Sequence, residues 1–233
     1  MQTHPLSLTH LIREPTITPI HLVREPAQAT SSRPPLLLLL HGVGSHESDL
    51  MSLAPYLDGR FLVISARAPL TLGPGAFGWY RVQFTPDGPT NDPAESARGW
   101  QAAADFIGEA VAAYDLDPSR VYLMGFSQGA IMSLSVALTQ PEVVAGAVIM
   151  SGRLLPEAAA QAAPPERLAG KPFLVVHGTY DTVLPIAMGR EIRDTLARLP
   201  VALTYREYPM GHQISQESLS DITAWLRERL DSR

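Results

Sequence analysis

One serine in this sequence lies in a motif suited to nucleophilic chemistry. Ser127 is flanked by Gly125 and Gly129 in the pattern Gly-Phe-Ser-Gln-Gly, between an apolar strand-like run and the start of a helical pattern. This G-x-S-x-G arrangement predicts a sharp strand–turn–helix elbow that lifts the serine oxygen clear of the sheet. Glycines are expected there because the residues two before and two after the serine lie too close to other backbone for a side chain. A purely structural serine is the alternative interpretation.

A serine nucleophile needs a base, and the base needs a carboxylate that orients it. Asp181 follows the apolar run 173–176 and His212 follows the run 203–208, so both lie on loops after predicted strands. The chain order serine, aspartate, histidine is the order that this elbow architecture requires. Taken alone, Asp181 could merely cap the next helix, and His212 could be a solvated loop histidine. Together with Ser127 they are predicted to form a catalytic triad.

An oxyanion formed on a substrate needs N–H donors, and two backbone amides are placed to supply them. One is the amide of Gln128, at the start of the helix that follows the serine. The other is the amide of Val43, which follows the run Leu36–Leu40 and lies between Gly42 and Gly44. These glycines allow a tight turn that aims the N–H inward. An ordinary glycine turn after a strand is the alternative.

The other histidines compete poorly for the role of the base. Three precede the core strands, and His177 is too near Asp181, so it is better explained as packing at a strand end. His41 and His46 lie on one loop, but no H-E-x-x-H or similar spacing supports a zinc site. The chain has no cysteine, which excludes disulfides, thiolate metal sites and a cysteine nucleophile. Neither a metal nor another cofactor is expected.

Short apolar runs alternate with longer helical patterns along the chain. Several of the runs are apolar on both faces, as is typical of strands covered by helices on each side. The best-defined helix begins after Asp92, with Pro93 at its first position, and the last begins near Ser215. This alternation predicts an α/β fold with a mostly parallel sheet flanked by helices. The predicted strands are Leu36–Leu40, Phe61–Ser65, Val121–Met124, Gly146–Met150, Phe173–Val176 and Leu203–Tyr208.

The N-terminal segment contains a small repeat. The hexapeptide His10–Pro15, His-Leu-Ile-Arg-Glu-Pro, recurs at His21–Pro26 as His-Leu-Val-Arg-Glu-Pro. Alternating residues and flanking prolines favour edge strands, so residues 1–30 are predicted to form an antiparallel edge hairpin. A binding role for the repeat is the alternative. The length of 233 residues fits one domain, 1–233, that includes this hairpin.

Composition and charge exclude several classes of partner. The formal net charge of −5, from 18 Lys and Arg against 23 Asp and Glu, offers no concentrated basic surface for nucleic acid or an anionic membrane. The N-terminus lacks the basic cluster and apolar run of a signal peptide. The run Leu36–Leu40 is far shorter than the roughly 18–20 residues of a membrane span. A cytoplasmic protein without stable membrane insertion is expected, and the oligomeric state is open, a homodimer included.

From about residue 30 to the end, these motifs resemble the carboxylesterase/phospholipase family of the α/β-hydrolase fold, which includes the acyl-protein thioesterases. The resemblance implies a cofactor-free serine hydrolase that cleaves carboxylic esters or thioesters. It also implies that Ser127 is the nucleophile, His212 the base and Asp181 its orienting group, with the Val43 and Gln128 amides as the oxyanion hole. The residues that carry it are Leu39-Leu-His41-Gly-Val-Gly44, Gly125-Phe-Ser-Gln-Gly129, His177-Gly-Thr-Tyr-Asp181 with Val183-Leu-Pro185, and Gly211-His212.

The sequence predicts a serine carboxylesterase that acts on short- to medium-chain esters of small molecules through an acyl-enzyme on Ser127. Cap domains in this fold usually follow the strand that ends here near Met150, and the stretch 151–172 is too short to form one. The connection 68–92 is expected to form an apolar wall of the site. Its predicted substrate-binding residues are Trp79, Phe84 and Leu72, unless Trp79 and Phe84 only pin the loop to the core.

Two other functions stay open from the sequence. The first is a thioesterase or lysophospholipase that acts on acylated proteins or lipids. The segment 44–49, Gly-Ser-His-Glu-Ser-Asp, is more polar than expected of a thioesterase loop tuned to lipidated proteins. The second is a non-catalytic, hydrolase-like binding protein, although such a protein would not need the triad and both glycine-flanked amides in order.

Overall fold

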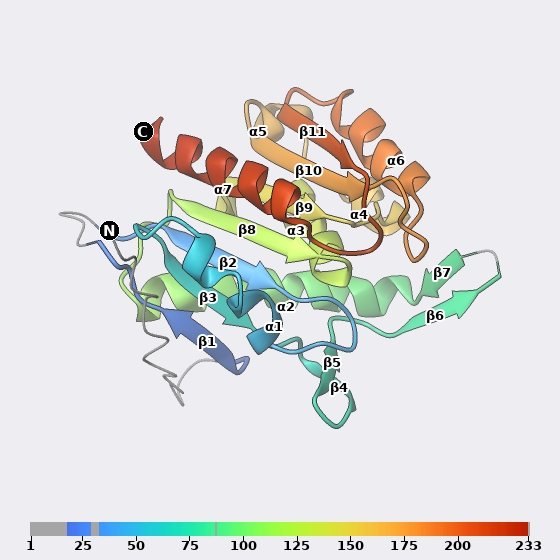
Figure 1. The fold of residues 1–233 in the computed structure, drawn as a ribbon, viewed down its shortest axis with the longest axis horizontal. Coiled ribbons are helices and arrows are strands. Elements are labelled where there is room, and N and C mark those ends of the chain that lie inside the picture. The colour runs from blue at the N-terminus through green and yellow to red at the C-terminus, as the bar shows by residue number, and fades with distance from the viewer. Residues whose placement is uncertain (1–17, 29–32, 87, 233) are drawn as a thin grey trace.

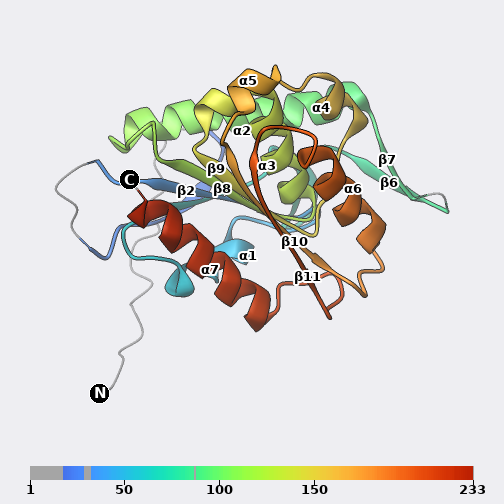
Figure 2. The same ribbon diagram turned by 90° about the horizontal axis from the view of Figure 1, so that it is seen from above.

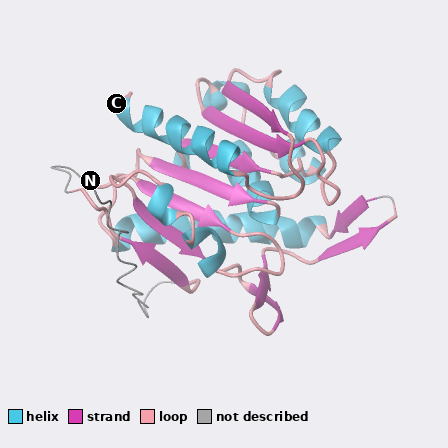
Figure 3. Ribbon diagram, viewed as in Figure 1, coloured by secondary structure: helices cyan, strands magenta, loops and turns pink. Residues whose placement is uncertain are grey.

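A seven-stranded sheet forms the centre of the protein. The computed structural model describes residues 18–28, 33–86 and 88–232. The strand order is β1-β3-β2-β8-β9-β10-β11, and all the strands are parallel to one another except β1, which is antiparallel to β3 (Figures 1 and 3). The predicted α/β fold with a mostly parallel sheet is therefore confirmed. The strands of this sheet are β1 (His21–Arg24), β2 (Leu36–Leu40), β3 (Leu62–Ala66), β8 (Val121–Phe126), β9 (Gly146–Met150), β10 (Pro172–Gly178) and β11 (Ala202–Tyr208).

All six predicted strands are present, and β2 and β9 have the predicted bounds. Every residue of β2 and β9 is buried, since helices cover both faces of the sheet there. The strands β8, β10 and β11 extend one or more residues beyond the predicted runs, and β3 is shifted by one residue. Because parallel strands end at the same edge of a sheet, the loops after β2, β8, β9, β10 and β11 are brought together.

Helices form a layer on each face of the sheet (Figure 2). One face carries α2 (Pro93–Ala113), α3 (Gln128–Thr139), α4 (Pro156–Ala160), α5 (Pro165–Leu168) and α6 (Ile186–Leu196). The other face carries α1 (Ser48–Met51) and α7 (Gln216–Asp231). Two short 3₁₀ helices, 54–56 and 141–143, complete the helical elements of the described residues.

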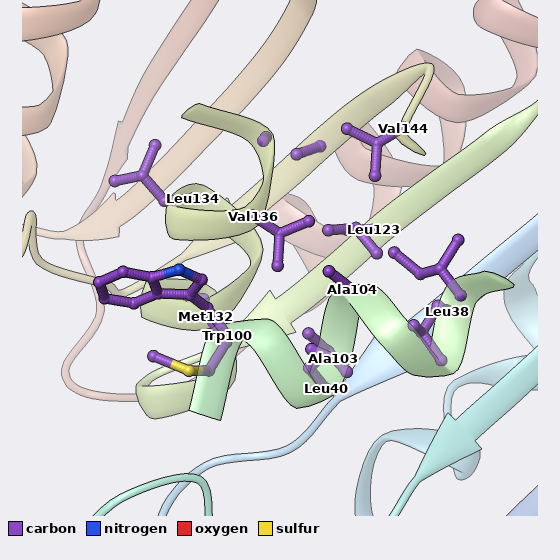
Figure 4. Packing of buried hydrophobic residues seen from close by; sticks show 14 of the residues in the cluster. Leu38, Leu40, Trp100, Ala103, Ala104, Leu123, Met132, Leu134, Val136 and Val144 are labelled. Carbon is purple, nitrogen blue, oxygen red and sulfur yellow. The ribbon is translucent and has the colours of Figure 1, made fainter. Parts of the chain in front are cut away.

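The packing of α2 against α3 supports the helix that begins at the elbow. Trp100 and Ala103 of α2 lie beside Met132 of α3, above the sheet residue Leu40 (Figure 4). All four side chains are almost completely buried. Truncating an aromatic side chain such as Trp100 in a core of this kind costs about 3–5 kcal/mol. The helix that follows Ser127 therefore rests on a closely packed layer.

The N-terminal repeat is described only in its second copy. Residues His21–Arg24 form the edge strand β1, which is antiparallel as predicted and pairs with β3. The Arg24 guanidinium donates hydrogen bonds to the carbonyl oxygens of Asp58 and Phe61, each at 3.0 Å. The first copy, His10–Pro15, lies outside the described residues. The partner of the second copy is thus β3 of the main sheet.

The long connection between β3 and α2 consists of two hairpins. The first pairs β4 (Leu70–Gly73) with β5 (Ala76–Gly78), and the second pairs β6 (Val82–Thr85) with β7 (Gly88–Asn91). The β6–β7 hairpin extends away from the body of the molecule (Figures 1 and 2). Between β9 and β10 the chain holds only α4 and α5, so no cap domain is inserted at this point, as predicted. Of the helices in the described ranges, none has the length and apolar character needed to span a membrane.

Candidate active site

Ser127 lies on a strained turn between β8 and α3. Its backbone angles are φ 53° and ψ −116°, a conformation that L-residues other than glycine rarely adopt. A Cβ added to Gly129 would lie 1.8 Å from the Leu40 carbonyl oxygen, and one added to Gly125 would lie 2.2 Å from that of Gly129. Both glycines are thus required by close backbone approach, as the motif predicts.

The structure brings the three predicted triad residues together. The Ser127 Oγ lies 2.9 Å from His212 Nε2, and His212 Nδ1 lies 2.7 Å from Asp181 Oδ2. Asp181 follows β10 and His212 follows β11, so three separate loops meet at one edge of the sheet. Because a carboxylate only accepts hydrogen bonds, His212 Nδ1–H donates to Asp181 and Nε2 accepts from the serine hydroxyl. This arrangement suits transfer of the serine proton to the imidazole.

Several contacts hold Asp181 and His212 in place. The second oxygen of Asp181, Oδ1, accepts hydrogen bonds from the backbone N–H groups of Val183 at 2.9 Å and Leu184 at 2.8 Å. The carboxylate is completely buried. The ring of Phe126, next to the serine, packs on the His212 imidazole with 4.9 Å between ring centroids. The orientation of the imidazole is therefore fixed by both bonding and packing.

His177 is a buried structural residue and not a partner of Ser127, in agreement with the prediction that it packs at a strand end. It is fully buried at the end of β10, and its Nε2–H donates to the Leu184 carbonyl at 2.7 Å. Burial lowers the pKa of His177, which keeps its imidazole neutral. Gly189 of α6 lies against the ring, since a Cβ there would come within 2.6 Å of Nδ1. His177 thus supports the loop that carries Asp181.

Val43, in the loop after β2, lies at the site. Val43 and Gln128 line the same cavity as Ser127, and within the described residues neither backbone N–H donates to another backbone group. Gly44 has φ +79°, which favours glycine, and its N–H donates to the Phe77 carbonyl at 2.7 Å. The two residues whose amides are predicted to bind an oxyanion therefore line the cavity at Ser127, and their N–H groups are not used by backbone acceptors of the described residues.

Buried His41 gives this loop its shape. Its Nδ1–H donates to the Gly42 carbonyl at 2.7 Å, and its Nε2 accepts from the Ala68 backbone N–H at 3.0 Å. Burial lowers the pKa of His41, so the neutral ring keeps both bonds. With both ring nitrogens bonded to backbone groups, His41 has no lone pair for a metal ion.

The side chain of Gln128 has a role that the sequence does not reveal. Its Oε1 accepts from the Trp79 backbone N–H and its Nε2 donates to the Tyr80 carbonyl, each at 2.8 Å. All three groups are buried. The amide thus ties the connection 68–92 to the first turn of α3, beside the serine. A glutamine within the motif is the only signal for this, and its partner cannot be predicted from spacing.

A cavity of about 280 Å³ opens in front of Ser127. Of the predicted substrate-binding residues, the structure does not place Trp79 or Leu72 at this cavity. Trp79 is buried and its indole N–H donates to the His41 carbonyl at 3.0 Å, whereas Leu72 is 42% exposed on the β4–β5 hairpin. The side chain of Phe84 lies outside the described residues. The apolar wall is formed instead by Tyr80, Val82, Pro89, Phe126, Ile131, Val183 and Leu184, and the charged groups at the cavity are Arg153 and Asp49.

Two curated proteins resemble this chain over about half of its length. Carboxylesterase SOBER1 of Arabidopsis thaliana is 30% identical over 115 residues, which cover 49% of this chain and 50% of that protein. Acyl-protein thioesterase 1 of Gibberella zeae is 33% identical over 116 residues, covering 48% of this chain and 49% of that protein. The chain thus spans about half the length of these curated relatives.

A solved structure extends the likeness over nearly the whole fold. The crystal structure of the Bacillus cereus carboxylesterase has a TM-score of 0.78 and 26% sequence identity, and the match covers 90% of this chain and 93% of that one. The model of the phospholipase/carboxylesterase family matches residues 22–230. Since that match includes the elbow, the loop after β2 and both loops that hold Asp181 and His212, this protein belongs to the phospholipase/carboxylesterase family.

Proposed function

We propose that this protein is a serine carboxylesterase that hydrolyses short- to medium-chain esters of small molecules through an acyl-enzyme on Ser127. The observation that carries this proposal is the unbroken hydrogen-bond chain from Ser127 to His212 to Asp181, with distances of 2.9 and 2.7 Å. Such a chain makes a hydroxyl nucleophilic at neutral pH, which an isolated serine is not.

The first half of the reaction forms the acyl-enzyme. His212 Nε2 accepts the Ser127 proton as Oγ attacks the ester carbonyl carbon and forms a C–O bond. The carbonyl oxygen becomes an oxyanion that the N–H groups of Val43 and Gln128 stabilise. Collapse of this intermediate breaks the bond to the alcohol oxygen, which takes the proton from His212 and leaves as the alcohol. Asp181 stabilises the imidazolium while it lasts.

The second half of the reaction hydrolyses the acyl-enzyme and regenerates the free serine, and it uses the same residues. Water gives its proton to His212 Nε2 as its oxygen attacks the acyl carbon, and the same two N–H groups hold the new oxyanion. The bond to Ser127 Oγ then breaks and Oγ takes the proton back. The products are one carboxylic acid and one alcohol, and no redox or metal chemistry is needed.

The size of the cavity supports small substrates. A volume of about 280 Å³ is at the lower end of what ligand pockets offer. Each further CH₂ that stays in water forgoes about 0.8 kcal/mol of burial energy, so long acyl chains gain little here. A series of p-nitrophenyl esters tests this. The rate should be highest for short or medium chains and should not jump at the micellar concentration of each ester.

Covalent labelling tests the proposal most directly. A fluorophosphonate reacts with an activated serine and adds its mass to the modified peptide. We expect labelling at Ser127 in the native protein and none in Ser127→Ala or in heat-denatured protein. Failure of the native protein to label would favour the non-catalytic binding protein of the same fold.

A thioesterase acting on acylated proteins or lipids is the second candidate. It is favoured by the likeness to the protein of Gibberella zeae named acyl-protein thioesterase 1. Side-by-side rates on short p-nitrophenyl esters and on long-chain acyl thioesters separate the two candidates. The proposal also includes a cytoplasmic location, which fractionation of cells that express the tagged protein can test.

A further inference from the structure

Arg153 brings a positive charge into the same cavity as Ser127. It follows β9 after only two residues and lines the cavity as a half-buried side chain. One terminal nitrogen of its guanidinium donates a hydrogen bond of 2.6 Å to Asn91 Oδ1, at the base of the β6–β7 hairpin. The guanidinium also interacts with the Tyr80 hydroxyl in the cavity wall. Because a guanidinium has five N–H donors in a planar fork, these two neutral partners leave other donors for a ligand.

No carboxylate of the described residues pairs with this guanidinium, because none has an oxygen within 4.0 Å of it. By contrast, Arg67 forms two bonds of 2.5 and 2.6 Å to Glu47. An arginine that lies beside Ser127 and has only neutral partners keeps its positive charge available for an anion.

The nearby acid, Glu157, is committed to other donors. It accepts hydrogen bonds from Asn91 Nδ2 at 2.8 Å and from the Ser96 hydroxyl at 2.6 Å. Burial acts to raise the pKa of Glu157, but these bonds and the Arg153 charge lower it overall, so it is ionised. Asn91 therefore stands between the two charges, giving its N–H to Glu157 and its oxygen to Arg153. This keeps Arg153 in place without neutralising it by contact.

The cavity is also polarised across the serine. In the sheet, β8 lies between β2 and β9, so residues that follow β2 and β9 lie on opposite sides of Ser127. Asp49 belongs to α1, after β2, and Arg153 follows β9, and both line the cavity. An anionic group on a substrate is attracted to the Arg153 side and repelled from the Asp49 side. The two charges thus favour one orientation of such a substrate.

We propose that the substrate is a small ester that carries a free carboxylate, which binds the fork of Arg153 while the ester group lies at Ser127. This inference rests on the proposed esterase function and names its substrate class. A carboxylate fits because its two coplanar oxygens match the guanidinium geometry. The cavity of about 280 Å³ suits a substrate with only a few carbons between its ester and its carboxylate.

Matched esters test this directly. The acyl-side pair is monoethyl glutarate and the ethyl ester in which an isopropyl group replaces the carboxylate, a change of charge at nearly constant shape. The alcohol-side pair is the acetate ester of γ-hydroxybutyrate and its isopropyl analogue. Acid release in a pH-stat gives kcat/KM for each ester. The pair with the larger anionic preference shows which half of the substrate contacts Arg153.

The decisive quantity is the ratio of anionic to neutral kcat/KM within a pair. In Arg153→Met, which keeps an unbranched apolar side chain and removes the charged head, we expect this ratio to fall about 10- to 100-fold. Arg206→Met is the matched control, because it removes the same charge from an exposed position of strand β11, and it should keep the ratio. Arg153→Lys should retain part of the preference, and added salt should reduce it.

Two outcomes overturn the inference. Equal losses on anionic and neutral esters in Arg153→Met, which leave the ratio unchanged, would show that Arg153 only supports the fold. A stronger preference for an ester that carries a phosphate would assign the fork to a phosphorylated substrate. If the native protein labels at Ser127 and cleaves neutral esters, these results count against the substrate class alone. If it neither labels nor cleaves any ester, the proposed function fails as well.

Discussion

The side-chain oxygen of Gln128 accepts a hydrogen bond of 2.8 Å from the backbone N–H of Trp79. The nitrogen of the same side-chain amide donates to the Tyr80 carbonyl. The Gln128 side chain thus anchors the residues at the cavity, in addition to the proposed role of its backbone N–H. Gln128→Ala keeps the backbone donor but leaves the buried Trp79 N–H without a partner. We expect the free energy of unfolding to fall by about 1–3 kcal/mol.

Urea unfolding together with p-nitrophenyl butyrate turnover measures this effect. Activity should fall too, since Tyr80 in the cavity wall loses its anchor. Gln140→Ala is the control, because Gln140 bonds the exposed side chain of Gln101 and its loss should cost less than about 0.5 kcal/mol. Equal stability of the two variants would contradict the anchoring role.

Ser127→Ala should abolish turnover and leave the fold intact. The hydroxyl bonds only His212 among the described side chains, so its loss removes little packing, and kcat should fall on the order of 10⁶-fold. Asp181→Asn should cost roughly 10⁴-fold because the imidazole adopts the wrong tautomer. Burst and steady-state kinetics with thermal melts check both. Ser220→Ala, on the exposed face of α7, should retain full activity, and substantial activity in Ser127→Ala would refute the nucleophile.

Gly129→Ala should prevent the elbow from forming. The added Cβ would lie 1.8 Å from the Leu40 carbonyl oxygen, far inside van der Waals contact, so β2 or α3 must move. Soluble yield, melting temperature and fluorophosphonate labelling report the damage. Gly108→Ala is the opposite control, because a Cβ at this exposed position of α2 meets no atom within 4 Å. That change should stabilise the helix by about 0.5–1 kcal/mol.

Acid should destabilise the protein partly through His177. Burial lowers the pKa of His177 below the ordinary value of 6.5, so below about pH 6.5 the unfolded chain binds a proton that the folded chain does not. The contribution of neutral His177 to the free energy of unfolding is therefore fully present above that pH. As the pH drops below it, the free energy of unfolding falls by on the order of 1.4 kcal/mol per pH unit for one proton. Asp181, Glu207 and His212 are the titratable groups that act on this ring.

His177→Gln retains a donor toward the Leu184 carbonyl and cannot take up a proton. Urea unfolding at pH 5 and pH 7.5 should therefore show a smaller loss of stability in this variant than in the native protein. The exposed residue His46 provides the control, and His46→Gln should leave the acid-side loss as it is. If the native protein and both variants lost the same unfolding free energy between pH 7.5 and pH 5, His177 would not be the cause of the loss.

Chelators should leave the esterase rate unchanged. Each proton transfer and each oxyanion contact in the proposed reaction is made by a side chain or backbone N–H of this chain, so nothing is lost when EDTA binds free metal. Initial rates with and without EDTA measure this. Loss of activity that zinc restores would contradict it.

The elbow could be predicted from the sequence because its constraints are local. Gly125 and Gly129 are only four residues apart, with Ser127 midway between them, and the close contacts that demand glycine arise within one turn and one neighbouring strand. The order of Asp181 and His212 along the chain was informative for a related reason. In a parallel sheet, each strand delivers its following loop to the same edge, so topology places these residues near Ser127 without details of packing.

The wall of the cavity could not be predicted in the same way. Trp79 and Tyr80 are neighbours in the sequence, and only the bonds of Gln128 to both decide which side chain faces the site. The position of the Arg153 guanidinium depends on Asn91, which is 62 residues away. Periodicity in the sequence does not predict such contacts, because they join elements whose relative positions depend on the whole fold.

His41 joins the loop after β2 to the backbone of Ala68, and it does so in the interior. In the proposed reaction, the N–H dipoles that face the developing negative charge are therefore oriented when the chain folds. Liquid water would have to turn its molecules toward that charge in every reaction event, and the work of doing so would recur each time. In this protein the same work is done once in the lifetime of each molecule, during its synthesis and folding, and every later turnover begins in a medium that is already ordered.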